Sequence, residues 1–332
     1  MAVESEMNRR AFLKGSLLTS AAGAFGLQAG GRVLAQGPGD KPAGQANPPA
    51  PKDGLPTGKI GKLSVSRLLL GGNLLTHYTH SRDLQYVYAL AEHYNTEAKI
   101  LETLALAETH GINTLSIHTV PWALDILKKH RKERGGKMQW IICPTAPVKD
   151  DMSAYSEQVA RLMDDGTEAI YLWGVHGDAL IAQGRVDLIA EAVSIARDRG
   201  LPSGVGAHDL RVIQACETQG VAADFYIKTF HHHRYPSAPK PGDIKGPYNE
   251  VPGYWCSDPQ ATADFMKGVA KPWIAFKVMA AGAIPPADAF AYAFANGADH
   301  VLAGMFDFEI AEDAKIARAA IDGAKRSRPW RS

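Results

Sequence analysis

The sequence has little cysteine, almost no net charge and no long apolar run. Its 332 residues include three cysteines, which are too few for a disulfide framework. The formal net charge of +1 gives no basic field, so nucleic acid is not expected as a partner. The apolar run Ser16–Leu27 is too short and too rich in glycine, alanine and serine for a permanent membrane span.

The N-terminus carries the pattern of an export signal. Arg9 and Arg10 stand side by side, Phe12-Leu13 and Lys14 follow, and Val33-Leu34-Ala35 offers small residues for cleavage. We therefore predict a twin-arginine signal over residues 1–35, with the twin-arginine export machinery as a partner and a periplasmic or other extracytoplasmic location. A frayed basic helix is the alternative reading of these residues.

Residues 36–60 are rich in proline, glycine and alanine, a composition that cannot bury a core and indicates a flexible linker. The remaining residues, 61–328, are long enough for one large core.

Strand-length apolar runs alternate with amphipathic stretches from Leu63 onward. Eight strands, each followed by a helix, predict an α/β fold with a single (β/α)₈ barrel, the TIM barrel, over residues 61–328. The predicted strands are Ser66–Gly72, Asn113–His118, Met138–Pro144, Ala169–Val175, Pro202–Ala207, Asp224–Phe230, Trp273–Met279 and His300–Met305. Helical patterns between the strands include Glu97–Thr109, Tyr155–Asp164, Val186–Asp198, Leu210–Glu217, Pro259–Val269, Pro286–Asn296 and Ile310–Ala324.

Two connections, 74–96 and 231–257, are longer than the others, and long loops of a compact barrel are usually functional. Both would lie at the carboxyl ends of the strands. Tyr254 and Trp255 in the second loop, together with Trp122, are candidate rings for stacking against a substrate. Anchoring of the loops by the same rings is an equal alternative.

Histidines follow several predicted strands, at the barrel end where active sites are built. Imidazoles that converge from several strands could bind a divalent metal, and a carboxylate could join them. The candidate metal ligands are His118, His176, His208, Asp209, His231 and His232. His118 and His176 are also candidate acid/base residues. The alternative is that each histidine bonds to backbone at a strand end.

Two lysines lie within predicted strands, where an ammonium group cannot lie comfortably under apolar helices. We therefore expect Lys228 and Lys277 to face the barrel interior as catalytic groups. Either could polarise a substrate or form a Schiff base with a carbonyl. An ion pair of Lys228 with Asp307 or Asp224 is an equal alternative.

Several segments resemble the aldo/keto reductase superfamily. They include Val65-Ser66-Arg67 with Gly71-Gly72, Gly111-Ile112-Asn113-Thr114, Tyr171-Leu172 through His176, and Lys277 through Gly282. The resemblance implies the same barrel and NAD(P) as an alternative cofactor. Backbone N–H groups of Gly304 and Met305, before the last helix, could bind a cofactor phosphate.

The catalytic tetrad of that family is not intact in this chain. The aspartate position falls on Ser116, the tyrosine position near Pro121 or Trp122, and the third strand offers Cys143 but no lysine. His176 is the one plausible match, to the family's histidine. The resemblance therefore supports the barrel more strongly than it supports carbonyl reduction.

These observations lead to three hypotheses. The leading one is an exported barrel enzyme that acts on a small polyhydroxylated or carbonyl substrate, sugar-derived, by metal- or histidine-assisted acid/base chemistry. The second is an NAD(P)-dependent oxidoreductase with a rewired proton donor, His118 or His176. The third is a non-catalytic barrel that binds a glycan or a partner protein.

Overall fold

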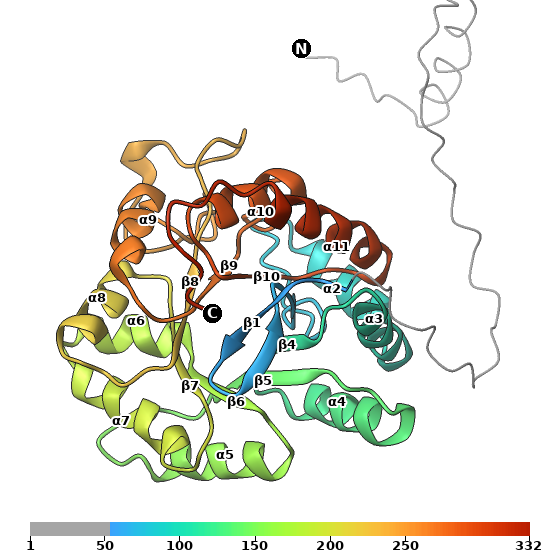
Figure 1. Cartoon of the computed structure of the whole chain (residues 1–332), viewed down its shortest axis with the longest axis horizontal. Coiled ribbons are helices and arrows are strands. Elements are labelled where there is room, and N and C mark those ends of the chain that lie inside the picture. The colour runs from blue at the N-terminus through green and yellow to red at the C-terminus, as the bar shows by residue number, and fades with distance from the viewer. Residues whose placement is uncertain (1–53) are drawn as a thin grey trace, which may run out of the picture. The chain divides into compact units, whose positions relative to one another are not determined.

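A closed barrel of eight parallel strands forms the centre of the protein in this computed structural model, which describes residues 54–332 (Figure 1). The strand order is β10-β3-β4-β5-β6-β7-β8-β9. The strands are β3 (Leu68–Gly71), β4 (Thr114–His118), β5 (Gln139–Cys143), β6 (Ala169–Leu172), β7 (Ser203–Ala207), β8 (Phe225–Thr229), β9 (Trp273–Phe276) and β10 (His300–Ala303). Each overlaps a predicted strand, so the predicted TIM barrel is confirmed. The predicted signal and most of the predicted linker lie outside the described residues.

Helices surround the barrel as an outer ring (Figure 1). They are α2 (Tyr86–Tyr94), α3 (Glu97–Thr109), α4 (Pro121–Arg134), α5 (Ser153–Asp164), α6 (Gly174–Ala182), α7 (Val186–Arg197), α8 (Leu210–Thr218), α9 (Pro259–Gly268), α10 (Pro286–Ala295) and α11 (Asp307–Asp322), with a short 3₁₀ helix η1 (Pro241–Asp243). The sequence prediction missed α2, α4 and α6. Within the described residues no helix is long and apolar enough to cross a membrane.

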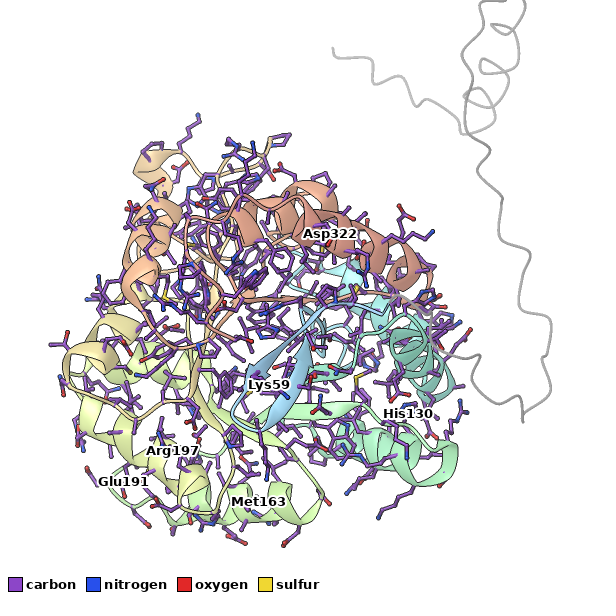
Figure 2. All side chains as sticks on the ribbon, viewed as in Figure 1. Lys59, His130, Met163, Glu191, Arg197 and Asp322 are labelled. Carbon is purple, nitrogen blue, oxygen red and sulfur yellow. The ribbon has the colours of Figure 1, made fainter. Side chains whose placement is uncertain are left out.

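A hairpin of β1 (Thr57–Ile60) and β2 (Leu63–Ser66) closes the amino end of the barrel. Ile60, Leu63 and Val65 pack with strand residues in the barrel interior, while Lys59 is exposed at the middle of the view (Figure 2). Strand β1 lies in the segment that we predicted to be a flexible linker. That prediction is wrong for 57–60, because alternate residues of this short strand are buried.

The core has two parts that are separated by the barrel wall. The interior cluster holds Phe225 and Ile227 of β8, whereas Tyr226 and Phe230 belong to the larger cluster between the strands and the helices. Because side chains alternate along a strand, Lys228 shares the outward direction of Tyr226. The prediction that Lys228 faces the barrel interior is therefore wrong.

Candidate active site

A cavity of about 250 Å³ opens at the carboxyl ends of the strands. Strand residues form its floor and the loops that follow the strands form its walls. Polar residues of its lining include Asn73, Tyr78, His80, Ser116, His118, Tyr171, His208, Thr229, Tyr248, Glu250 and Lys277. Both long loops contribute to it, as the sequence predicted: Tyr78 and His80 come from the first, and Tyr248 and Glu250 from the second.

A histidine–carboxylate pair lies on one side of this cavity. His208 follows β7, and its Nδ1 lies 2.7 Å from Oδ2 of Asp178 on α6. The other carboxylate oxygen accepts the backbone N–H groups of His208 and Asp209, at 3.0 and 2.9 Å. Because an ionised carboxylate only accepts hydrogen bonds, Nδ1 of His208 carries the proton and Nε2 is left as an acceptor. Burial lowers the pKa of His208 to about 4, although the hydrogen bond to Asp178 acts to raise it.

The position of Asp178 depends on close packing of α6 against β7. Gly177 lies so near that a Cβ there would be 2.7 Å from the carbonyl oxygen of Gly206. A larger residue would push the first turns of α6 away from the strand, and Asp178 with them. Tyr248 from the second long loop covers the His208 ring, with ring centroids 4.4 Å apart.

A second histidine–carboxylate pair joins the two long loops across the cavity. Nδ1 of His80 lies 2.9 Å from Oε1 of Glu250, and the same oxygen accepts the indole N–H of Trp255 at 3.2 Å. Burial acts to raise the pKa of Glu250, but His80, the indole N–H of Trp255 and the charge of Lys277 together outweigh it, and the pKa is lowered. Burial also lowers the pKa of His118, which lines the cavity from the end of β4, and neighbouring His80 lowers it further.

The ammonium group of Lys277 faces the same cavity. Strand β9 ends at Phe276, and Lys277 has φ +55°, a left-handed conformation that is rare for a residue with a side chain. By alternation alone Lys277 would share the outward direction of Ala275, so the turn after the strand brings the side chain inward. Burial lowers the pKa of Lys277 to about 7, against the attraction of Glu250 and Asp178. The inward placement that we predicted is correct, but it depends on this turn, since Lys277 lies after the end of the strand and not within it.

Lys228 is buried outside the cavity. Its Nζ donates to the carbonyl oxygen of Thr229 at 2.9 Å and to the hydroxyl of the same residue at 3.2 Å. It forms no ion pair with Asp307 or Asp224 within the described residues. A catalytic role for Lys228 is not supported by this position, because the ammonium group is satisfied in the barrel wall.

The predicted metal shell is not assembled. Residues 54–332 contain no group of three or more histidine, cysteine, aspartate or glutamate side chains that could hold a metal ion. The His231 ring lies 3.0 Å from the carbonyl oxygen of His232 and accepts the N–H of Trp255. His232 is 3.0 Å from Asp288. Asp209 caps α8 and pairs with Arg211. Backbone bonding, the alternative that the sequence left open, holds for His231, whereas His232 and Asp209 are paired with charged side chains.

His176 is also separated from the cavity. The sequence predicted a strand up to Val175, but β6 ends at Leu172 and His176 lies in the first turn of α6. Its ring packs edge-on against Trp173, with centroids 5.3 Å apart. The apolar residues around Trp173 fit a buried strand and a buried helix start equally well, which explains the error. Of the predicted imidazoles, His118 and His208 line the cavity, and His80 joins them.

The predicted cofactor-phosphate site does not suit a phosphate. Met305 is buried, and α11 begins after Phe306, whose N–H is already bonded to Glu309. Asp307 lies in the same first turn, where it accepts from Tyr94 and pairs with Lys99. Two carboxylates at this helix start would repel an anion. The segment Gly304-Met305 therefore does not fit the diphosphate of a dinucleotide.

The predicted substrate rings have other roles. Tyr254 and Trp255 are fully buried, and the hydroxyl of Tyr254 accepts the N–H of Lys245. They anchor the second long loop. Trp122 is 41% exposed, but it stacks on His77 beside a separate groove that also contains Glu92. Tyr78 and Tyr248 are the tyrosines that line the walls of the main cavity.

Comparison with known proteins shows the fold. No protein-family profile matches the chain, and no curated protein matches it. Two solved structures from Pseudomonas aeruginosa, both provisionally assigned as aldo-keto reductases, are similar to it. The first has a TM-score of 0.55 and 16% identity and covers 81% of this chain and 98% of its own. The second has a TM-score of 0.54 and 17% identity and covers 80% and 94%. These similarities show the fold, the closed (β/α)₈ barrel that the order of strands and helices predicted.

Proposed function

We propose that the protein is an enzyme that transfers protons on a small, neutral carbonyl or polyhydroxylated substrate. The observation that carries the proposal is the His208–Asp178 pair on the cavity wall, with its free acceptor nitrogen and with Lys277 facing the same space. We do not keep metal-assisted chemistry in the proposal, because the predicted histidine and aspartate ligands do not come together in the described part of the chain.

His208 acts as the general base in this proposal. Its Nε2 accepts a proton from a substrate hydroxyl or from a carbon next to a carbonyl group, and Asp178 holds the ring and stabilises the imidazolium that forms. Tyr171 on the cavity floor keeps its proton, because burial, together with the Cys143 thiol, raises its pKa well above the usual value. It is therefore a hydroxyl donor for a substrate oxygen.

The lining favours a neutral, hydroxyl-rich substrate. Hydroxyl and amide groups of Asn73, Tyr78, Thr229 and Tyr248 surround the space, and no arginine is among the described lining residues. Carboxylate and phosphate groups usually need a guanidinium or several ammonium groups. A cavity of about 250 Å³ is smaller than the roughly 300–1,000 Å³ of pockets for drug-sized ligands. A sugar-derived aldehyde or ketone of a few carbons suits this size and polarity.

The experiment is hydrogen exchange in deuterated water. The full chain is incubated with dihydroxyacetone, glyceraldehyde, ribose or glucose, and NMR follows deuterium entering the carbon next to the carbonyl. We expect exchange with at least one of these, slowed by about 10²–10⁴ in His208→Asn. His232→Asn is the matched control, because that histidine also pairs with a carboxylate but lies outside the cavity. Absence of exchange with all four compounds, or equal exchange in His208→Asn, contradicts the proposal.

We also propose that the protein is exported by the twin-arginine machinery, on the strength of Arg9 and Arg10 in the N-terminal sequence. Replacing both by lysine keeps the charge and removes the adjacent guanidinium groups. Cell fractionation should then find the variant retained in the cytoplasm and the wild type outside it. Equal export of the two proteins would refute a twin-arginine route.

A further inference from the structure

We propose that Lys277 is a nucleophile that forms an imine with the carbonyl carbon of a neutral hydroxy-aldehyde or hydroxy-ketone. The inference rests on the proposed function for the identity of the cavity and its substrate class, and it adds a covalent step. Three features of the described residues support it: the backbone at Lys277, the absence of a counter-ion, and the contrast with Lys228.

The backbone after β9 is held in an unfavourable conformation that directs Lys277 into the cavity. Lys277, Ala280 and Ala281 have φ of +55°, +47° and +56°. Residues with a side chain rarely adopt this conformation, so the surrounding structure must hold the turn. Arg82 from the first long loop does so, because its guanidinium donates to the carbonyl oxygen of Ala280 at 2.9 Å. Strain of this kind is concentrated at functional sites.

Within residues 54–332, Nζ of Lys277 forms no ion pair and no hydrogen bond. The nearby carboxylates are already engaged, Glu250 by His80 and Trp255, and Asp178 by His208. Instead, Nζ lies over two aromatic rings, 5.3 Å from the centroid of Trp255 and 5.6 Å from that of Phe276. An ammonium group in such a place loses its proton more easily than one beside a carboxylate.

Lys228 shows what a structural buried lysine looks like in the same barrel. Its ammonium group is bonded to Thr229 and does not line the cavity. Burial lowers the pKa of both lysines, so the distinction is one of position: the amine of Lys277 faces the cavity and that of Lys228 does not. With the pKa of Lys277 lowered to about 7, about half of the molecules carry a neutral amine there at neutral pH. The neutral amine is the form that attacks a carbonyl.

The proposed step balances without an oxidant or reductant. The lone pair of Nζ forms a C–N bond with the carbonyl carbon while the C=O π bond breaks. Nε2 of His208 takes a proton from the nitrogen and passes it to the carbonyl oxygen, which gives a neutral carbinolamine. A proton from solvent water then protonates the carbinolamine hydroxyl, which leaves as water while the C=N bond forms. The resulting protonated imine acidifies the neighbouring carbon, and His208 can then remove a proton from it to give an enamine.

The test is reductive trapping in the full-length protein. Wild type is mixed with dihydroxyacetone, glyceraldehyde, ribose or glucose, treated with borohydride, digested and mapped by mass spectrometry. We expect a reduced adduct on Lys277, at least about tenfold more abundant than on Lys228 or on exposed Lys59. Lys277→Arg and Lys277→Met should lose both the adduct and the deuterium exchange, whereas Lys228→Arg should keep both. Circular dichroism and urea unfolding verify that each variant is folded.

The outcomes separate the two proposals. Exchange in Lys277→Arg at the wild-type rate overturns the imine, because arginine keeps the positive charge but cannot form the C=N bond, and it leaves proton transfer by His208 standing. Absence of a Lys277 adduct with all four compounds, in a protein that still exchanges deuterium, also overturns the imine alone. An adduct on Lys277 in a His208→Asn protein without exchange supports both proposals.

Discussion

Replacing Asp178 by asparagine should disable His208 without unfolding the barrel. The carboxylate accepts three hydrogen bonds, two from backbone N–H groups to Oδ1 and one from Nδ1 of His208 to Oδ2. An asparagine can keep its carbonyl oxygen towards the backbone, but its NH₂ group then faces Nδ1. Two donors cannot bond, so the proton moves from Nδ1 to Nε2 and the cavity-facing nitrogen no longer accepts a proton.

The size of the effect follows from these bonds. Loss of the general base should reduce deuterium exchange by about 10²–10⁴, or roughly 3–5.5 kcal/mol in the activation barrier. Replacement of the charge-assisted hydrogen bond by a neutral one, from the asparagine NH₂ group to Nδ1, should reduce the free energy of unfolding by about 1 kcal/mol. Nitrogen NMR of the His208 ring reports the tautomer directly and needs no substrate.

Asp288→Asn is the matched control. Asp288 also pairs with a histidine, His232, at 3.0 Å, but its side chain is 51% exposed and lies outside the cavity. We expect exchange at the wild-type rate in this variant. The reasoning is refuted if Asp178→Asn keeps the wild-type ring tautomer, or if it exchanges as fast as the control.

Two further predictions concern stability. Asp299 is fully buried and accepts from Arg328 at 2.7 Å and from the backbone of Trp273 and Arg331, so Asp299→Ala should lower the free energy of unfolding by about 3–5 kcal/mol. Urea unfolding measures this loss, and a change below 1 kcal/mol would contradict a structural role for the buried pair. Burial lowers the pKa values of His208, His231 and His300 to about 4, 3 and 4, below the ordinary 6.5. The stability that these neutral rings contribute is fully present above pH 6.5 and is lost as the pH falls towards 4. The urea midpoint should therefore fall over that range, and a flat midpoint would show that the rings are not buried in neutral form.

The sequence identified the strands better than it identified the directions of their side chains. All eight strands were predicted, because runs that are apolar on both faces stand out between amphipathic helices. The hairpin β1–β2 was missed, since Thr57–Ile60 continues a proline-rich segment and offers few apolar residues.

The candidate site was predicted in part. His118, His208 and Lys277 were predicted site residues and line the cavity, the histidines because they come at the ends of predicted strands and Lys277 because an ammonium group does not suit the apolar space under the helices. Asp178 was not recognised as the partner of His208. Thirty positions separate the two residues. Their contact depends on α6 starting at Gly174, inside the segment Ala169–Val175 that we predicted to be a strand.

The amino-acid sequence alone determined the barrel and the end of it that carries the polar groups. The barrel follows from the order of the apolar runs, and the polar end follows from the histidines and other polar residues that come directly after those runs. The tertiary structure decided which lysine enters the cavity. Lys228 and Lys277 each lie at a strand end, yet the ladder register turns Lys228 outward and a left-handed turn, bonded to Arg82, turns Lys277 inward. The side of the barrel wall to which a side chain points changes when the strand register shifts by one residue or when one backbone dihedral angle changes. Long-range contacts, and not the local sequence, determine the register and these angles.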